Sequence, residues 1–310
     1  YFVRELLGSG AEIAVFEASP QTGGRTDHFV YDNVSYETGA SIIYSGNVHF
    51  ANLTDQMGLH RIPPRHAEGG GLGLWNGKKF ATVTGQTKFV NIMKMAWRYK
   101  RSLFTVRSVV MHFLAKFEDI YALQAEGKFF LSAEELWDRL GLLDLTKVTI
   151  QDFIRGAVGR NNTLIEKELV FAVNRVNYNQ DNSLNALAGL VSLCPLITGD
   201  IFQVEEGNSK LSEELVKAAG AHLRLDTRVT AVAGPSPPSA GGGYSVMAGQ
   251  EKLGQFDAVL VAAPLALAGI SFDVRWRSGE SLPRPSLPRV EFQSTHATFV
   301  KGVVNREYFG

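Results

Sequence analysis

Several features that would place a sequence quickly in a functional class are missing from this one. One cysteine, Cys194, in 310 residues excludes an internal disulfide, a Cys-x-x-Cys redox pair and a cysteine-rich zinc site. No run of about eighteen apolar residues occurs, so no spanning helix is expected. The 31 Lys and Arg residues balance 31 Asp and Glu residues, and this zero net charge gives no electrostatic case for nucleic-acid binding.

The common catalytic motifs are missing as well. The seven histidines are scattered without metal-ligand spacing, and the sequence has no HExxH, no GxSxG and no lysine P-loop. Cys194 precedes Pro195 and is more typical of a core residue than of a nucleophile. We therefore expect no metal site.

A nucleotide-binding pattern is present near the start, in the segment VFEASPQTGGRT, residues 15–26. A short buried strand ends on Glu17, and an acid at this place in a βαβ unit accepts hydrogen bonds from the ribose hydroxyls of a dinucleotide. Gly23 and Gly24 let the backbone approach a pyrophosphate, and Arg25 offers planar donors to a phosphate. A plain surface turn is the alternative, but Gly-Gly-Arg after the acid favours FAD in its extended form over NAD.

The glycine loop that should precede this strand is not in the chain, which opens with YFVRELLGSGAEI. That opening predicts the tail of a crossover helix, a Gly-Ser-Gly turn and then the strand. We expect the chain to be a piece of a longer protein that was cut inside its first βαβ unit.

Four later segments are expected near the same cofactor, although each alone also fits an ordinary turn or core strand. YETGASII places Gly39, Ala40 and Ser41 where the backbone can lie against a flavin ring, and VEEGNSKL places Gly207 before a helix N-terminus. The other two are LDTRVTAV, a strand ending in Arg228 and Val229 that would hold adenine, and DAVLVAAP, a fully buried parallel strand ending near Ala263.

The remaining pattern predicts an interleaved α/β protein. Hairpins are predicted at 28–44, with the turn at Asp32-Asn33, and at 71–83, with the turn at Asn76-Gly77. Predicted helices are 87–126 (broken near Arg101-Ser102), 132–140, 163–176, 183–193 and 209–220, and predicted strands are 12–17, 201–205, 222–232, two short strands before 256–270, and a pair in 291–304. Residues 233–243 are rich in Pro, Ser and Gly and predict an exposed loop.

Two surface features remain open. The cationic, aromatic stripe at residues 97–116 is expected to pack one face inward, with contact to a membrane surface as the alternative. Asn33, Asn52 and Asn161 each begin an N-x-S/T sequon, which permits a secretory route and glycosylation.

In order, the segments FEASPQTGGRT, YETGASII, WRYKRSLF…FEDIYALQ, NRVNYNQDNSLNALAGLVSL, VEEGNSKL and DAVLVAAPL resemble the prenylcysteine oxidase family, called farnesylcysteine lyase in plants. The resemblance runs from about residue 13 to residue 310, and the block at 174–193 is its most specific part. It implies an amine-oxidase-like fold with a Rossmann-like FAD-binding domain at 1–60 and 200–270, and a substrate domain at 61–199 and 271–310. The C-terminal part that closes the flavin site in the family is also expected to be missing.

The resemblance further implies a thioether oxidase that uses FAD, O₂ and water to convert prenylcysteine into a prenyl aldehyde, cysteine and H₂O₂. The prenyl C1 hydrogens are allylic and next to sulfur, so hydride loss to the flavin needs no strong protein base. The helical region would then supply an apolar channel for the isoprenoid, and Asn177 and Tyr178 are the candidates near the flavin or the cysteine end. A lysosomal, vacuolar or endomembrane location is expected from the family.

Two alternatives share parts of these motifs. Another FAD amine oxidase or a desaturase would use the same cofactor segments on a different substrate. A non-catalytic prenyl-binding protein of the Rab-escort or GDP-dissociation-inhibitor type would share the fold without flavin, and the retained Glu17 and Gly23-Gly24-Arg25 disfavour it.

Overall fold

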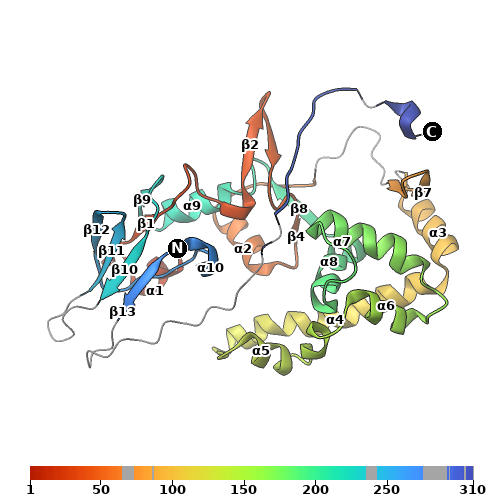
Figure 1. Cartoon of the computed structure of the whole chain (residues 1–310), viewed down its shortest axis with the longest axis horizontal. Coiled ribbons are helices and arrows are strands. Elements are labelled where there is room, and N and C mark those ends of the chain that lie inside the picture. The colour runs from red at the N-terminus through yellow and green to blue at the C-terminus, as the bar shows by residue number, and fades with distance from the viewer. Residues whose placement is uncertain are drawn as a thin grey trace. The chain divides into compact units, whose positions relative to one another are not determined.

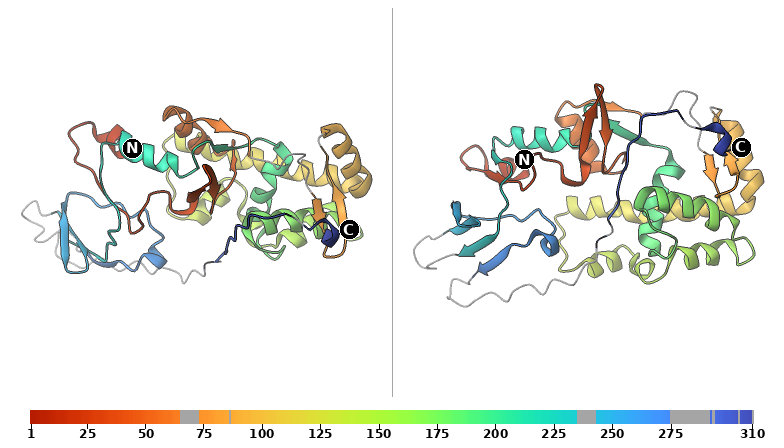
Figure 2. Two further views of the ribbon diagram at one scale, coloured as in Figure 1. Left: turned by 90° about the horizontal axis from the view of Figure 1, so that it is seen from above. Right: turned by 45° about the horizontal axis from the view of Figure 1, so that its top comes forward.

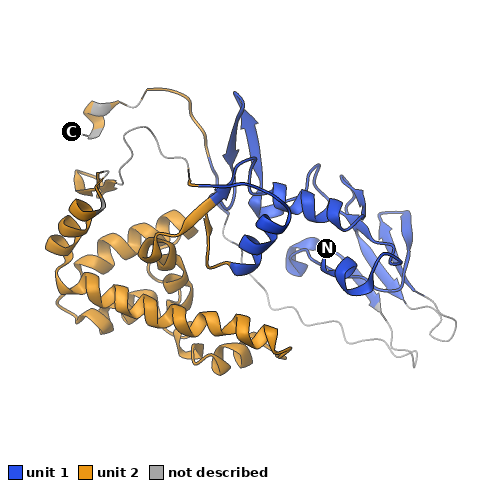
Figure 3. Cartoon of the chain, turned by 180° about the vertical axis from the view of Figure 1, so that it is seen from behind, with its two compact units in different colours: residues 1–41, 48–62, 203–297 blue, residues 42–47, 63–202, 298–310 orange. Residues whose placement is uncertain are grey.

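A computed structural model describes residues 1–64, 73–85, 87–234, 243–274, 292, 294–303 and 305–309. The chain forms two compact units, shown in Figure 3. Unit 1 comprises residues 1–41, 48–62 and 203–297, and unit 2 comprises residues 42–47, 63–202 and 298–310. Each unit is thus assembled from segments that are far apart in the sequence.

Unit 1 holds most of the strands (Figure 1). Its strands are β1 (Ala14–Phe16), β2 (His28–Tyr31), β3 (Val34–Glu37), β5 (Arg61–Ile62), β9 (His222–Arg224), β10 (Ala231–Gly234), β11 (Tyr244–Ala248), β12 (Glu251–Phe256) and β13 (Ser271–Val274). Its helices are α1 (Phe2–Leu7), α2 (Val48–Gln56), α9 (Lys210–Ala218) and α10 (Leu265–Ala268), with a 3-10 turn, η1 (Gly24–Thr26).

Two sheets organise this unit. Strands β1 and β9 pair in parallel, with Val15 opposite Leu223, as a nucleotide-type unit requires. A second sheet has the order β12-β11-β10-β13, in which β10 is antiparallel to β11 and parallel to β13 (Figure 2). The β2–β3 hairpin turns at Asp32 and Asn33 as predicted, with φ of 54° and 57°, the left-handed pair that a tight hairpin turn requires.

Unit 2 is mainly helical. Its helices are α3 (Lys88–Tyr99), α4 (Arg101–Ala125), α5 (Ala133–Arg139), α6 (Ile150–Val158), α7 (Phe171–Tyr178) and α8 (Ala186–Thr198), with the short turns η2 (Leu143–Thr146) and η4 (Arg306–Phe309) and a π-helix, η3 (Glu166–Val170). Strands β6 (Gly73–Trp75) and β7 (Phe80–Val83) form the second predicted hairpin, and β4 (Ile43–Tyr44) pairs with β8 (Ile201–Val204). Strand β8 also pairs with β5, so its second half lies in unit 1.

The core of unit 2 lies where α4, α6 and α8 meet. Val110, Ile150, Ile154, Leu190 and Leu193 are fully inaccessible to solvent there. Burying these side chains contributes roughly 1.5–3 kcal/mol each to the stability of the unit.

Local capping explains the helix boundaries. The break predicted near Arg101-Ser102 occurs at Lys100, whose φ of 51° ends α3 and starts α4. Helix α5 begins at the predicted Ser132 cap, whose hydroxyl accepts the Glu135 N–H at 3.1 Å. The inward packing expected for residues 97–116 is confirmed for α4, where Val106 and Phe113 are buried, but it is wrong for Trp97, which is 85% exposed.

The structure differs from the strand predictions in three regions. Residues 257–264 are irregular and mostly exposed, with Leu260 79% exposed, instead of a buried parallel strand. An apolar strand of this kind needs neighbours on both edges and cover on both faces, and no strand in the described part of unit 1 pairs with it. Residues 294–303 are irregular as well and do not form the predicted strand pair.

The third correction concerns residues 222–232. Strand β9 ends at Arg224, because residues 225–227 turn back to bond with the chain after β1, and β10 starts only at Ala231. Arg228 and Val229 therefore lie in an irregular connection rather than at a strand end. The start of the 71–83 hairpin, most of the 233–243 loop, and positions 291, 293 and 304 of the predicted strand pair fall outside the described residues.

The compact units do not follow the predicted domain boundaries everywhere. Residues 42–47 belong to unit 2, and unit 1 resumes at residue 203 and extends to residue 297. Within that last range, residues 271–274 form β13, which pairs with β10. Which unit holds a cofactor and which holds a substrate stays a prediction.

Candidate functional site

The acid of the nucleotide pattern lies at the carboxyl end of a parallel strand pair. Glu17 follows β1, and its backbone N–H donates to the carbonyl of Arg224 at 2.9 Å, while its carbonyl accepts the N–H of Thr227 at 2.8 Å. Its side-chain Oε1 accepts the N–H of Ser19 at 2.8 Å, which fixes the carboxylate beside the strand end. Ligands of open α/β sheets bind at this edge, so the position suits a ribose-binding acid.

The Gly-Gly-Arg segment forms a tight turn that requires glycine at position 23. Gly23 and Gly24 have φ of 119° and 53°, and the N–H and hydroxyl of Thr26 donate to the Gly23 carbonyl at 3.0 and 2.8 Å. A Cβ on Gly23 would lie 2.5 Å from the Cβ of Ser209, whereas a Cβ on Gly24 would meet no atom within 4 Å. Gly23 thus allows close packing against Ser209, whereas the backbone at Gly24 is uncovered and lies beside the exposed Arg25.

The segment 39–41 lies directly against this turn. The N–H of Ala40 donates to the carbonyl of Arg25 at 2.9 Å, and a Cβ on Gly39 would stand 2.0 Å from that same oxygen. Gly39 is therefore required for the two backbones to approach each other. Gly39, Ala40 and Ser41 are themselves exposed.

Asn208 joins these segments to the turn after β8. Its side-chain Oδ1 accepts the N–H of Val204 at 2.9 Å, its Nδ2 donates to the Ala40 carbonyl at 2.7 Å, and its backbone N–H donates to Glu37 Oε1 at 2.8 Å. Asn208 is fully buried, so each of these bonds is shielded from water. Neighbouring Gly207 has φ of 110°, and a Cβ there would lie 2.9 Å from the His28 ring.

Glu37, which accepts a hydrogen bond from Asn208, has a shifted pKa. Burial raises the pKa of the Glu37 carboxyl above its ordinary value, opposed by the Asn208 hydrogen bond and by nearby His28. Its second oxygen, Oε2, is buried without a hydrogen-bond partner in the described part of the protein. His28 in turn shares a 2.7 Å hydrogen bond between its Nδ1 and the Ser209 hydroxyl, which completes the link between β2 and the start of α9.

The structure thus brings together three of the predicted cofactor segments, which carry Gly23–Arg25, Gly39–Ala40 and Gly207. Glu17 lies at the end of β1, and residues 226–227 bond to the chain around it, so Arg228 and Val229 follow close behind in sequence. Arg228 is exposed and Val229 half-buried. Ala263 lies in the exposed segment before α10, and none of the hydrogen bonds described above reaches it. Contact of all these residues with a cofactor stays a prediction.

The sequence pattern identified Gly207 in the segment VEEGNSKL as a site residue but not the adjacent Asn208. An Asn directly after a Gly at a strand-to-helix turn is the signal that could have identified it. A short side chain with both a donor and an acceptor can satisfy backbone groups on two neighbouring segments at once.

The catalytic candidates lie in unit 2, at the end of α7. Asn177 Nδ2 donates to the carbonyl and the hydroxyl of Ser192 at 3.0 and 3.1 Å, so its amide already fastens α7 to α8. Tyr178 is 37% exposed, and burial of the rest of the side chain raises the pKa of its phenol. The phenol stays neutral at physiological pH and can donate a hydrogen bond.

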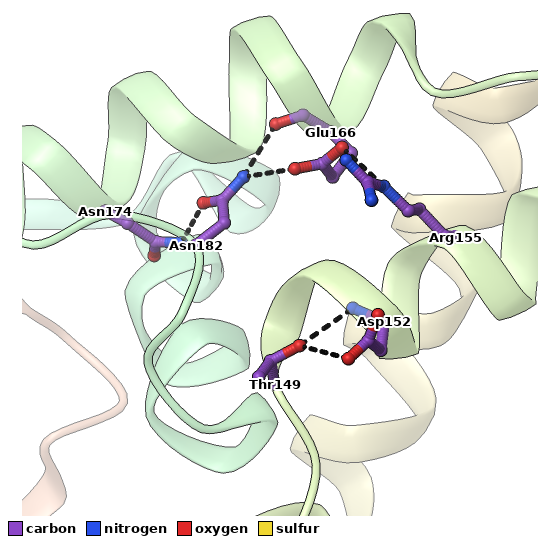
Figure 4. Close-up of polar contacts among 6 residues, drawn as sticks. All are labelled: Thr149, Asp152, Arg155, Glu166, Asn174 and Asn182. Atoms are coloured by element: carbon purple, nitrogen blue, oxygen red, sulfur yellow. Dashed lines mark hydrogen bonds and ion pairs between the residues drawn. The ribbon is translucent and has the colours of Figure 1, made fainter.

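The same sequence block contributes to a buried polar chain, shown in Figure 4. Asn174 Nδ2 donates to Asn182 Oδ1 at 2.9 Å, and Asn182 Nδ2 donates to the backbone and the carboxylate of Glu166 at 2.9 and 2.8 Å. Arg155 Nε donates to the other Glu166 oxygen at 3.0 Å. Glu166 opens the π-helix η3, so the chain of bonds supports an irregular backbone that needs additional partners. Asn174 and Asn182 of the 174–193 block therefore have a structural role in unit 2.

Unit 2 also contains a pocket of about 360 Å³ between the end of α4 and the start of α5. Its lining mixes the apolar Ile120, Phe130 and Leu136 with the polar Gln124 and Lys128. The assignment of an isoprenoid channel to the helical region stays a prediction. No helix in the described ranges is long and apolar enough to cross a membrane.

Comparisons with known proteins agree with these features. The family profile for Prenylcysteine lyase matches residues 83–310. Farnesylcysteine lyase of Arabidopsis thaliana is 29% identical over 97% of this chain and 59% of its own length. Prenylcysteine oxidase 1 of Mus musculus is 29% identical over 100% of this chain and 61% of its own length. The chain thus spans about 60% of the length of these curated relatives.

Solved structures show the same fold. An A394C mutant of putrescine oxidase superimposes with a TM-score of 0.58 at 18% identity, covering 93% of this chain and 58% of that one. Cyclohexylamine oxidase from Brevibacterium oxydans gives 0.54 at 17% identity, covering 86% and 56%. The predicted α/β fold of the amine-oxidase type is confirmed. On the strength of the match over 83–310, the chain belongs to the prenylcysteine lyase family.

Proposed function

We propose that this protein is an FAD-dependent oxidase that cleaves the thioether of free prenylcysteine. The observation that carries the proposal is family membership over 83–310, together with the three glycine segments that converge in unit 1. In the overall reaction prenylcysteine, O₂ and water give a prenyl aldehyde, free cysteine and H₂O₂. One C–H bond and the C–S bond at prenyl C1 break, a carbonyl forms there, and sulfur leaves as the cysteine thiol.

The residues of unit 1 fit a dinucleotide. Glu17 stands at the carboxyl end of β1 and would hold ribose hydroxyls, and the open backbone at Gly24 beside the exposed Arg25 would receive the pyrophosphate. Glu37 Oε2, buried without a hydrogen-bond partner among the described residues, is an unsatisfied polar atom beside these segments. When bound, FAD would supply the acceptor for the two electrons that leave prenyl C1 as hydride.

Such a reaction requires few catalytic groups from the protein. Positive charge that develops at C1 is delocalised over sulfur and the allylic system, so no strong base has to remove a proton. The tasks left to the chain are to orient C1 and to exclude bulk water. Tyr178, with its neutral phenol, is the better of the two predicted candidates for positioning the substrate, because Asn177 is already engaged with Ser192.

Cofactor binding is tested by titrating the purified chain with FAD and following quenching of flavin fluorescence. We expect Arg25→Ala to weaken FAD binding roughly tenfold, since it removes a charge-assisted hydrogen bond to phosphate. Arg107→Ala is the control, because Arg107 is also exposed but lies on α4. Equal affinities of both variants and the unaltered chain would contradict the assignment of Arg25.

Substrate turnover is tested with farnesylcysteine in air. Cysteine, farnesal and H₂O₂ should appear in equal amounts if a thioether oxidase is at work. A protein that binds farnesylcysteine without FAD and without peroxide would overturn the proposal in favour of a prenyl-binding protein. Release of an amine-derived aldehyde with no free cysteine would favour another amine oxidase.

We also propose passage through the secretory route to a lysosomal, vacuolar or endomembrane compartment. All three sequon asparagines, Asn33, Asn52 and Asn161, are exposed in the structure, which supports their use as glycosylation sites. Expression of the whole protein in eukaryotic cells should give a product whose mass falls on treatment with an endoglycosidase. A product that never carries glycan and is found in the cytosol would contradict this route.

A further inference from the structure

Helix α3 presents its apolar face to solvent. Phe89, Met93 and Trp97 follow one another at intervals of four residues and are 71%, 56% and 85% exposed. Val90 and Ile92 flank this row and are 45% and 58% exposed. Five large apolar side chains on one helix face form a contiguous patch, whereas single exposed apolar residues are ordinary on protein surfaces.

The polar face of the same helix is fastened to unit 2, which fixes this unusual orientation. Asn91 forms two hydrogen bonds with the backbone of Gly85, at 2.8 and 2.7 Å. Arg98 donates to both oxygens of Glu168 at 2.7 and 2.6 Å, and the hydroxyl of buried Tyr99 donates to the same carboxylate at 3.0 Å. Met95 and Tyr99 of α3 pack against the core of unit 2, so the face that carries Phe89, Met93 and Trp97 is left toward solvent.

The surroundings of the patch are basic. Residues 87–117 contain no Asp or Glu, although the whole chain has zero net charge. The basic residues in this range are Lys88, Lys94, Arg98, Lys100, Arg101, Arg107 and Lys116. Lys94, Lys100, Arg101 and Arg107 are exposed, and Phe104 on the first turn of α4 adds a further apolar side chain that is 60% exposed.

We propose that α3 and the start of α4 bind an anionic lipid bilayer as an interfacial helix. An apolar face that contains Trp and Phe, flanked by Lys and Arg and free of acids, matches the acyl boundary and the anionic headgroups together. The excess of positive charge selects a negatively charged surface over a second copy of this neutral chain. Figures 1 and 2 show α3 at one edge of the helices of unit 2, where nothing in that unit covers it among the described residues.

The proposal goes beyond the proposed function and stands without it. The exposed apolar face of α3 can contact lipid whether or not flavin binds to unit 1. If both hold, the enzyme works at the surface into which its isoprenoid substrate partitions.

The first test is co-sedimentation of the purified chain with vesicles. We expect binding to vesicles of phosphatidylcholine with phosphatidylserine, and much weaker binding to phosphatidylcholine alone or at high salt. The double variant Phe89→Ala, Trp97→Ala should lower the partition coefficient by about tenfold or more, because two large apolar side chains no longer enter the bilayer. Phe129→Ala with Val176→Ala is the matched control, since both residues are about as exposed but lie elsewhere in unit 2.

A second test reports on the helix itself. Cys194 is buried, so in a Cys194→Ala background Met93→Cys can carry an environment-sensitive fluorophore, with Asn161→Cys as the exposed reference position. Anionic vesicles should shift the emission of the label at position 93 to the blue and leave the label at 161 unchanged. Both labelled chains must keep the unfolding temperature of the parent chain for the comparison to count.

Three results would overturn the proposal. The first is vesicle binding that the double variant leaves unchanged. The second is an absence of binding to anionic vesicles by the folded chain. The third is a concentration-dependent dimer, seen by analytical ultracentrifugation without lipid, that the double variant converts to monomer, because it would assign the face to a second copy.

Discussion

The carboxylate of Glu37 accepts the backbone N–H of Asn208 at 2.8 Å, and this bond ties the end of β3 to the turn that precedes α9. The second Glu37 oxygen is buried without a hydrogen-bond partner in the described residues, and burial raises the pKa of the group. Asn208 Nδ2 holds the Ala40 carbonyl at the same time, so two predicted cofactor segments depend on this pair. Burial of the Glu37 charge destabilises the folded state, whereas the hydrogen bond with Asn208 stabilises it.

The first prediction concerns the pH dependence that Glu37 imposes. Because its pKa is raised on folding, its contribution to stability is fully present below the ordinary value of 4.5 and is lost as pH rises through the folded-state pKa. Glu37→Gln keeps an acceptor for Asn208 and carries no charge, so it should lose less stability than the parent chain between pH 4 and pH 7. Urea unfolding at a series of pH values measures the difference. A difference that is constant with pH, or grows in the other direction, would contradict it.

The second prediction concerns Gly39. A Cβ at this position would lie 2.0 Å from the Arg25 carbonyl oxygen, so Gly39→Ala must push the Gly-Gly-Arg turn away from the segment 39–41. Overpacking of this kind costs about 1–3 kcal/mol or more, and we expect a clear fall in the unfolding temperature and in FAD affinity. Gly10→Ala is the control, because a Cβ there meets no atom within 4 Å. Equal behaviour of the two variants would mean that the two segments do not touch in solution.

Sequence patterns correctly predicted structural features that depend on residues close together in the sequence. The turn at Asp32-Asn33, the cap at Ser132 and the break near Arg101 follow from residues a few positions apart, and the structure contains them all. The bonds of Asn208 to Glu37 and Ala40, which bring residues 207–208 to the segment 39–41, join residues more than 160 positions apart, and local patterns do not specify such partners. Asn208 was missed for this reason.

The same distinction explains the errors. DAVLVAAP has the composition of a buried strand, but a strand also needs partners, and residues 257–264 have none among the described strands. The amphipathic pattern of α3 predicts a helix correctly without saying which face turns inward. That choice depends on Asn91 and Arg98, whose partners lie outside the helix.

The third prediction concerns the buried polar chain of unit 2. Asn182→Ala removes both donors to Glu166 and the acceptor for Asn174, and leaves Arg155 as the Glu166 side-chain partner in this chain of bonds. The buried Glu166 carboxylate would keep Arg155 but lose its hydrogen bond from Asn182, and Asn174 would lose its acceptor, so we expect a loss of about 1–3 kcal/mol in the free energy of unfolding. Asn161→Ala, at an exposed position nearby in sequence, should change it by less than about 0.5 kcal/mol. A loss for Asn182→Ala as small as that of the control would show that water replaces the missing amide.

The fourth prediction concerns the single thiol. Cys194 is 3% exposed on α8, its Sγ donates to the Leu190 carbonyl at 3.3 Å, and burial raises its pKa from 9.0 to about 11. Two units of pKa reduce the thiolate fraction at neutral pH about a hundredfold, and burial blocks access as well, so a thiol reagent should react with the native chain only through unfolding. We expect rapid, stoichiometric labelling in denaturant and very slow labelling in buffer. Met93→Cys, on the exposed face of α3, provides the reference for a reactive thiol on the same fold. Rapid labelling of the native parent chain would show that α8 opens locally, and that the core around Leu190 is less stable than its complete burial indicates.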